Sequence, residues 1–139
     1  MDHDIIVSGG GIAGLTATAA FAHAGFKVLC VDPAQPIIQR DAQGSDLRST
    51  AFLQPARALL QEIGLWDRLA PFSEALQIMR IIDAGGEEPE ARAIKEFNAA
   101  DISDDPFGWN LPNWLLRREM AAHLESLDNV DYRTGVSAQ

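Results

Sequence analysis

Three glycines near the start of the chain have the spacing that holds a pyrophosphate. Gly9, Gly11 and Gly14 come directly after a short β-branched run and open a segment rich in alanine and leucine. In this arrangement Gly9 allows a tight turn, Gly11 lets phosphates approach the backbone, and Gly14 lets the helix pack closely on the sheet. Free N–H groups and the positive helix end would then bind the anion. We expect the whole turn to contact a dinucleotide, through Gly9, Gly10, Gly11, Ile12, Ala13 and Gly14.

An acidic residue stands at the end of the next expected strand. Asp32 follows Gly9 by 23 residues and closes an apolar run. A carboxylate at this position can accept both ribose hydroxyls of an adenosine. Because it is not an arginine, it favours a ribose with a free 2′-hydroxyl over one with a 2′-phosphate. Together with its strand and helix, the motif indicates binding of FAD or NAD. A glycine turn without a ligand would explain neither the glycine spacing nor the acid.

The elements around these residues predict an α/β fold with a Rossmann-type FAD/NAD(P)-binding βαβ core of parallel strands. Residues 5–7 and 27–32 are apolar enough for two buried strands. Residues 12–24 between them predict a helix, which Gly25 should end. We assign residues 1–35 to this dinucleotide-binding unit.

An excursion over residues 36–112 follows the βαβ unit. We expect a helix at 55–63, with a proline at its first position. A small strand pair is expected at 75–83 and 92–97, with a turn at Gly85–Gly86.

The last segment, residues 113–139, predicts a helix and a third parallel strand at 130–134. Asn113 can cap this helix, which would begin after Pro112. Its apolar side would be formed by Leu116, Met120, Leu124 and Leu127. We treat residues 1–139 as a single N-terminal portion of an FAD-binding domain.

The composition restricts the partners that the protein can have. The formal net charge is −9, from 11 basic and 20 acidic residues, and such a surface repels nucleic acid. The chain has a single cysteine, Cys30, which lies in an apolar run. One cysteine cannot form an internal disulfide, and this fits a reducing compartment. The three histidines have no metal-ligand spacing, so we expect no metal. Neither a signal sequence nor a spanning segment is evident, which predicts a cytoplasmic protein and leaves peripheral membrane contact open.

Two longer segments resemble the FAD-dependent aromatic hydroxylases. A plain NAD-binding domain usually continues at once with a further helix and strand, whereas a long excursion follows Pro33 here. Within it, Asp46-Leu47-Arg48-x-x-Ala51 is similar to a segment of the flavoprotein aromatic hydroxylases. The stretch from Phe107 to Glu119 resembles their ubiquinone-biosynthesis branch, the UbiH-type or 2-polyprenyl-6-methoxyphenol hydroxylase-like enzymes. The resemblance covers nearly all of the chain.

The resemblance implies a monooxygenase that holds FAD non-covalently. Such enzymes reduce FAD with NAD(P)H and use O₂ to hydroxylate an electron-rich ring, here a small phenolic or polyprenyl-phenolic substrate. It also implies that Arg48 contacts the phosphate and ribityl portion of FAD. One arginine of the pair Arg117 and Arg118 should reach FAD as well; the residues leave the choice open, and Arg118 is our candidate. No catalytic residue is implied within the chain.

Three departures from the family pattern qualify these expectations. Ser8 stands where the family usually has an apolar residue, and Asp32 where it more often has glutamate. The family's later Asp-Gly and Gly-Asp segments have no match, so we expect an incomplete domain that is inactive alone. Such a domain would self-associate through the apolar side of helix 116–127 and through unpaired strand edges. A peripheral contact with a quinone-biosynthesis complex is also open.

Two alternatives remain at this stage. The first is an FAD- or NAD-linked dehydrogenase or reductase, against which the segment from Asp46 to Ala51 speaks. The second is a truncated remnant that binds a nucleotide without catalysis.

Overall fold

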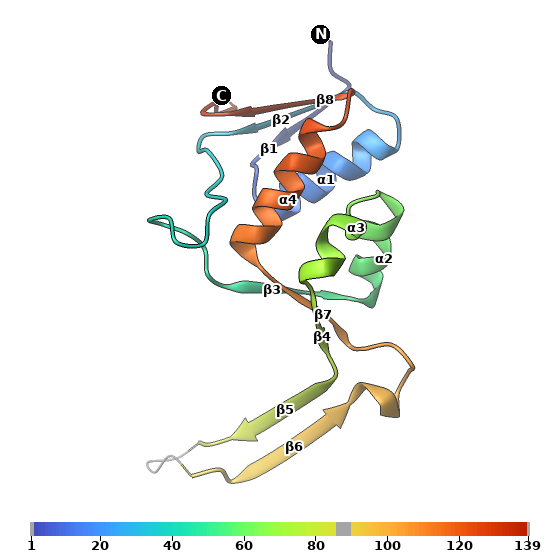
Figure 1. Ribbon diagram of the computed structural model, residues 1–139, viewed down its shortest axis with the longest axis vertical. Helices are drawn as coiled ribbons and strands as arrows, with labels where there is room; N and C mark the ends of the chain where they lie inside the picture. Colours follow the sequence, from blue (N-terminus) through green and yellow to red (C-terminus); the bar gives the residue numbers. More distant parts are fainter. Residues whose placement is uncertain (1, 86–89, 139) are drawn as a thin grey trace.

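Three parallel strands form the sheet that carries the glycine turn (Figure 1). The computed structural model describes residues 2–85 and 90–138. Strand β2 (Val28–Asp32) lies between β1 (Ile5–Ser8) and β8 (Val130–Thr134), and it is parallel to both. The predicted α/β class with a parallel βαβ core and a third parallel strand is confirmed.

Two helices pack against this sheet and against each other. Helix α1 (Ile12–His23) contacts β1 and β2, and helix α4 (Asn113–Glu125) contacts β8 and α1. Gly25 follows α1 with a φ of +93°, a conformation that glycine adopts without strain. The predicted bounds of α1 therefore hold to within one residue.

A second sheet, which the sequence did not predict, joins distant parts of the chain. Strands β3 (Ser49–Leu53) and β4 (Glu74–Leu76) both pair antiparallel with β7 (Gly108–Pro112). The prediction of a single strand over 75–83 was wrong in one respect, because this segment forms two strands that are separated at Gln77. Its first part pairs with β7, whereas its second part forms a separate hairpin.

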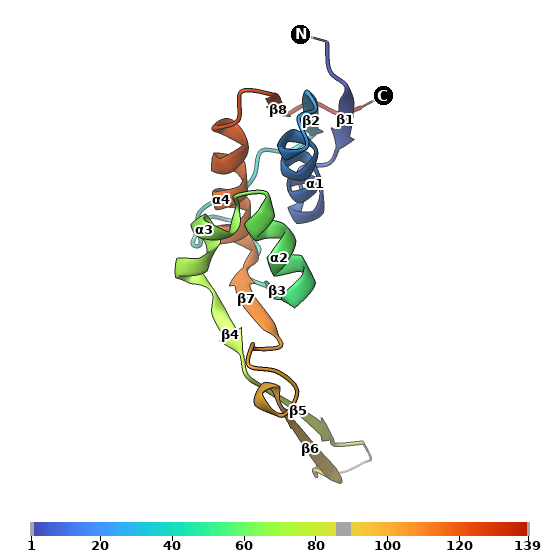
Figure 2. The ribbon, with the colours of Figure 1, turned by 90° about the vertical axis from the view of Figure 1, so that its right-hand side faces the viewer.

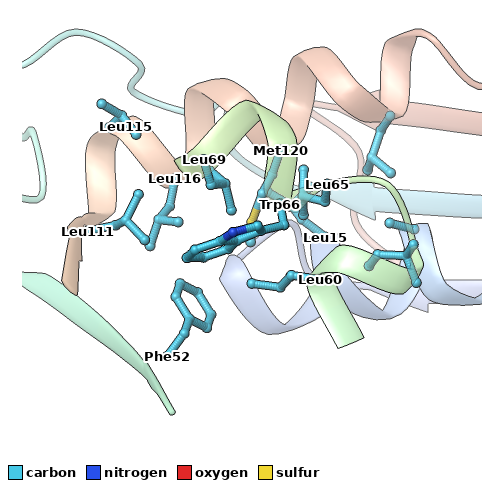
Figure 3. Close-up of a cluster of buried hydrophobic side chains, with 13 residues drawn as sticks. Leu15, Phe52, Leu60, Leu65, Trp66, Leu69, Leu111, Leu115, Leu116 and Met120 are labelled. Atoms are coloured by element: carbon cyan, nitrogen blue, oxygen red, sulfur yellow. The ribbon is translucent and has the colours of Figure 1, made fainter. Parts of the chain in front are cut away.

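Two short helices cover the core between the sheets. Helix α2 (Gln54–Glu62) is followed by α3 (Trp66–Leu69) and a 3₁₀ turn, η1 (Ala70–Phe72). Pro55 lies at the second helical residue of α2 rather than the first, a difference of one position. Figure 3 shows side chains from α1, β3, α2, α3 and α4 converging on Trp66. The fully buried members of this core include Leu15, Leu60, Leu65, Leu69, Leu111, Leu116, Met120 and Leu124.

A run of exposed apolar side chains lies on a hairpin rather than on the apolar side of α4. Leu116, Met120 and Leu124 are at most 1% exposed, so the expectation that this side of α4 would be open was wrong; α1 and α3 cover it. Strands β5 (Ile78–Asp83) and β6 (Ala93–Asn98) instead form a hairpin that extends away from the body (Figure 2).

All residues of both hairpin strands are exposed, including five isoleucine and methionine side chains. The 3₁₀ turn η2 (Ala99–Asp101) leads from β6 towards β7. The turn predicted at Gly85–Gly86 lies partly outside the described residues, since Gly86 is not among them.

Candidate dinucleotide-binding site

The glycine turn joins β1 to α1 and lies against the end of β2. Gly9 has a φ of +114°, and its N–H donates to the carbonyl of Val31 at 2.8 Å. Gly11 precedes α1 with extended backbone angles, and a Cβ placed on it would meet nothing within 4 Å. A Cβ placed on Gly14 would lie 1.8 Å from the carbonyl oxygen of Gly9. Gly14 therefore permits close packing, whereas the space beside Gly11 is open to a ligand.

Asp32 is held at the turn by two backbone donors. Its Oδ2 accepts from the N–H of Gly10 at 2.6 Å, and its Oδ1 accepts from the N–H of Ala34 at 2.8 Å. A carboxylate offers about four acceptor positions, so lone pairs remain for ribose hydroxyls. A Cβ on Gly10 would come within 3.0 Å of the Cβ of Asp32. The missing side chain at Gly10 is thus what allows the acid to lie this close.

A cleft of about 210 Å³ opens beside the turn. Its lining brings together the glycine turn, the end of β2, the loop after it, α4 and β8, through Gly10, Gly11, Asp32, Ala34, Gln35, Pro36, Arg117 and Tyr132. A second cavity of about 320 Å³ shares Gln35, Pro36 and Tyr132 with the first. Residues from five separate segments therefore line one polar space.

The two adjacent arginines of α4 have different surroundings. Arg117 lines the cleft at the glycine turn, and its buried Nε has no hydrogen-bond partner among residues 2–85 and 90–138. Arg118 lines the second cavity, and its Nε donates to Glu119 at 2.8 Å. Its guanidinium also lies 5.3 Å from the ring centre of Trp114 and 5.5 Å from that of Phe72. The geometry thus favours Arg117 over our candidate Arg118, whose role stays a prediction.

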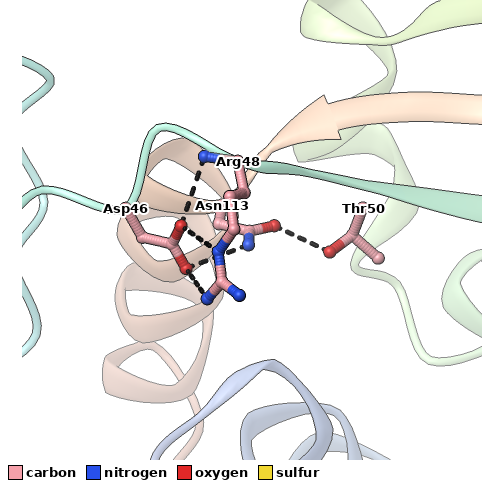
Figure 4. Close-up of polar contacts among 4 residues, drawn as sticks. All are labelled: Asp46, Arg48, Thr50 and Asn113. Carbon is pink, nitrogen blue, oxygen red and sulfur yellow. Dashed lines mark hydrogen bonds and ion pairs between the residues drawn. The ribbon is translucent and has the colours of Figure 1, made fainter. Parts of the chain in front are cut away.

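Arg48 belongs to a polar network at the start of α4 (Figure 4). Its Nε and one terminal nitrogen donate to the two carboxylate oxygens of Asp46, each at 2.9 Å, while 83% of its side chain is exposed. Arg48, with Asn113 as the second donor, holds the pKa of Asp46 well below its usual range. The predicted contact of Arg48 with the cofactor stays a prediction.

Asn113 is not the cap that the sequence predicted. It is the first residue of α4, Pro112 holds the cap position, and no side-chain cap bond forms. The buried Asn113 amide instead donates to Asp46 at 3.0 Å and accepts from the Thr50 hydroxyl at 2.7 Å. The sequence could not show this, because both partners lie more than sixty residues earlier in the chain.

Gln35, Pro36 and Tyr132 were not predicted as lining residues. The first two belong to the loop that Pro33 begins, and the third lies in the middle of β8. A position directly after the acidic end of β2 could have indicated Gln35 and Pro36. No sequence signal indicated Tyr132, because its place in the cleft depends on β8 lying beside β2.

Two negative observations apply to the part of the chain that the structure describes. No group of three or more histidine, cysteine, aspartate or glutamate side chains is arranged to bind a metal ion. No helix there is both long and apolar enough to cross a membrane.

Comparison with known proteins supports an FAD site in this position. Residues 4–44 match the family model described as FAD binding domain. Over 124 residues the chain is 31% identical to the ubiquinone hydroxylase UbiL of Rhodospirillum rubrum, covering 89% of the chain and 27% of that protein. It is also 30% identical to the 3-(3-hydroxy-phenyl)propionate/3-hydroxycinnamic acid hydroxylase of Mycolicibacterium gilvum, covering 96% of the chain and 22% of that protein.

Residues 4–44 thus match an FAD binding domain, and most of the chain is similar to part of two hydroxylases. The predicted resemblance, with FAD as the cofactor, is confirmed, and the chain spans less than a third of the length of these relatives. The fold agrees with the crystal structure of p-nitrophenol 4-monooxygenase PnpA from Pseudomonas putida. The TM-score is 0.69 at 21% identity, over 94% of this chain and 30% of that one.

Proposed function

We propose that this chain binds the adenosine and pyrophosphate half of FAD in a flavoprotein monooxygenase. The observation that carries the proposal is the cleft in which the glycine turn, Asp32 and Arg117 meet. Carboxylate acceptors suit ribose hydroxyls, and a guanidinium beside free N–H groups suits phosphates. The residues present therefore fit the group that the match over residues 4–44 implies.

The roles follow from position. Gly9 and Gly11 leave open space for the pyrophosphate, and Gly10 lets Asp32 lie against the turn. Ile12, Ala13 and Gly14 supply the first turn of α1, whose positive end attracts the pyrophosphate. Asp32 would accept from the ribose, and Arg117 would neutralise a phosphate charge. Arg48 and Arg118 remain candidates for contacts elsewhere on the cofactor.

Bound FAD, once reduced, would supply the oxygen chemistry. We propose NAD(P)H as the reductant and hydroxylation of a phenolic or polyprenyl-phenolic ring in ubiquinone biosynthesis as the reaction of the whole protein. The names of the relatives, a ubiquinone hydroxylase and a hydroxyphenyl-propionate hydroxylase, support hydroxylation over the dehydrogenase alternative. The part of this chain is to bind and orient the cofactor.

We further propose a cytoplasmic protein with peripheral contact to the inner membrane or to a quinone-biosynthesis complex. The reason is the substrate class, since a polyprenyl phenol partitions into lipid. Self-association would use the exposed apolar side chains of the β5–β6 hairpin.

Calorimetric titrations of the chain with FAD and with ADP test the binding role. Asp32→Ala should weaken both ligands roughly tenfold to a hundredfold, because charge-assisted hydrogen bonds are lost. Asp101→Ala, at an exposed position away from the cleft, is the matched control. Circular dichroism melts of each variant separate lost binding from lost folding. Equal affinities of wild type and Asp32→Ala would remove this residue from the site.

A second assay tests the activity. The 139-residue chain should bind FAD weakly, with nearly the affinity of ADP, and should show no NADH-dependent oxygen uptake with a simple phenol. The oxygen chemistry that FAD would supply requires the exclusion of water, which an exposed flavin lacks. Tight FAD binding with phenol-stimulated turnover would show instead that these 139 residues contain a complete active site.

A further inference from the structure

The hydroxyl of Tyr132 is a buried hydrogen-bonding group without a partner. Tyr132 lies in the middle of β8, directly opposite Cys30 of β2. Within the described ranges 2–85 and 90–138, its hydroxyl oxygen is buried and makes no hydrogen bond. Leaving a buried donor unpaired is unfavourable. A partner for this group is therefore expected to come from outside the described chain.

The hydroxyl points at the glycine turn. A Cβ placed on Gly10 would lie 2.9 Å from the Tyr132 oxygen, so the phenol stands directly against this glycine. Tyr132 also lines both the cleft at the turn and the cavity next to it. Gly10 thus leaves room for two neighbours at once, the carboxylate of Asp32 and the phenol of Tyr132.

The cleft brings this hydroxyl together with a second unpaired donor. The Nε of Arg117 is buried and also lacks a hydrogen-bond partner among the described residues. The carboxylate oxygens of Asp32 accept from Gly10 and Ala34, and neither accepts from the phenol. Two unpaired donors on side chains that line one small cleft suit an anionic oxygen with several lone pairs. A phosphate oxygen has this chemistry.

We propose that the Tyr132 hydroxyl donates a hydrogen bond to a phosphate oxygen of the bound dinucleotide, beside Arg117. This inference rests on the proposed FAD-binding function and adds a cofactor contact from outside the glycine motif. Burial, with smaller effects of Cys30 and Asp32, raises the pKa of Tyr132 to about 12. The phenol therefore keeps its proton at neutral pH and can donate.

The substitution Tyr132→Phe tests the contact, because it removes the hydroxyl and keeps the ring. In calorimetric titrations of the 139-residue chain, the variant should bind ADP roughly twofold to tenfold more weakly than wild type. Its thermal unfolding without ligand should occur at the same or a higher temperature, since an unpaired buried donor is gone. A merely structural role of the hydroxyl would instead lower the unfolding temperature and leave the affinity unchanged.

The outcomes separate this inference from the proposed function. Wild type and Tyr132→Phe binding ADP with equal affinity would overturn the Tyr132 contact and leave the FAD site intact. A wild-type chain that binds neither ADP nor FAD would overturn the proposed function and the contact together. If Tyr132→Phe lowers the affinity for adenosine as much as the affinity for ADP, the hydroxyl lies at the ribose. That result would overturn the phosphate assignment.

The chain contains one tyrosine, which allows a direct measurement. With tyrosine labelled by ¹³C at the ring carbon that carries the hydroxyl, a single NMR signal reports Tyr132. Saturation with ADP should shift this signal, whereas saturation with adenosine should leave it in place. A signal that ADP leaves unchanged would overturn the contact.

Discussion

The carboxylate of Asp32 accepts a hydrogen bond from the backbone N–H of Gly10 at 2.6 Å. This bond ties the turn after β1 to the end of β2, two segments that are 22 residues apart. The acid is thus oriented before any ligand arrives, which lowers the entropic cost of binding. It also means that Asp32 supports the turn as well as the site, so variants here need a folding control.

Replacing two glycines of the same turn by alanine should have different effects, on stability at Gly14 and on ADP affinity at Gly11. Gly14→Ala places its Cβ 1.8 Å from the Gly9 carbonyl oxygen, and we expect it to destabilise the chain by about 1–3 kcal/mol or more. Gly11→Ala has open space and backbone angles that alanine tolerates. It should keep the stability to within about 1 kcal/mol and weaken ADP binding, because its methyl group enters the phosphate space.

Urea unfolding and ADP titration of both variants check this pair. The assignment of roles would be reversed by a Gly11→Ala variant that is less stable than Gly14→Ala. It would also fail for a Gly11→Ala variant that binds ADP as tightly as wild type.

The adjacent arginines of α4 form a matched pair for a second prediction. Arg117→Ala should reduce the affinity for ADP by about tenfold or more, since an arginine–phosphate hydrogen bond is worth about 1.5–3 kcal/mol. Arg118→Ala should leave ADP affinity nearly unchanged and cost about 0.5–1 kcal/mol of stability, through its lost contacts with Trp114 and Phe72. A larger loss of ADP affinity in Arg118→Ala than in Arg117→Ala would show that Arg118 is the arginine that contacts the cofactor.

Asn113 should matter for stability through its two hydrogen bonds. Asn113→Ala removes the acceptor of Thr50 and a donor to Asp46 at a buried position. We expect a loss of about 1–3 kcal/mol in urea unfolding. Gln54→Ala is the control, because this amide also makes two hydrogen bonds but lies at the surface. Equal losses in the two variants would show that burial of the network contributes nothing.

His123 should make the fold sensitive to mild acid. It is a buried residue of α4, and its burial, with a smaller effect of Arg68, lowers its pKa below the usual 6.5. Below about pH 6.5 the unfolded chain therefore binds a proton that the folded chain resists. The stabilising contribution is present above this pH and is lost as the pH falls further.

Urea midpoints at pH 7.5 and 5.5 measure the effect. The decrease between them should be smaller in His123→Gln than in wild type, since the titrating group is gone. His23→Gln, at an exposed position of α1, controls for the loss of a histidine. The same decrease in His123→Gln and in wild type would assign the acid sensitivity to other groups.

The sequence by itself determined the βαβ unit and the identity of its chemical groups. The turn, its glycines and Asp32 lie within 24 residues, where local rules apply: an apolar run, a glycine spacing and an acid after the next strand. The structure adds geometric reasons for the same residues, such as the close approach of Gly14 to the Gly9 carbonyl oxygen. The hairpin β5–β6 was also predictable, because its strands are neighbours in sequence.

Only the tertiary structure decided which distant residues share the cleft. Strands β3 and β7 are short and unremarkable as sequence, and they become strands through pairing across more than fifty residues. That pairing places the buried Asn113 beside Asp46 and Thr50, where two hydrogen bonds outweigh a local helix cap. The position of α4 turns Arg117 rather than Arg118 to the glycine turn, and β8 brings Tyr132 to Gly10. A side chain's direction depends on what its element packs against, and local sequence does not contain that information.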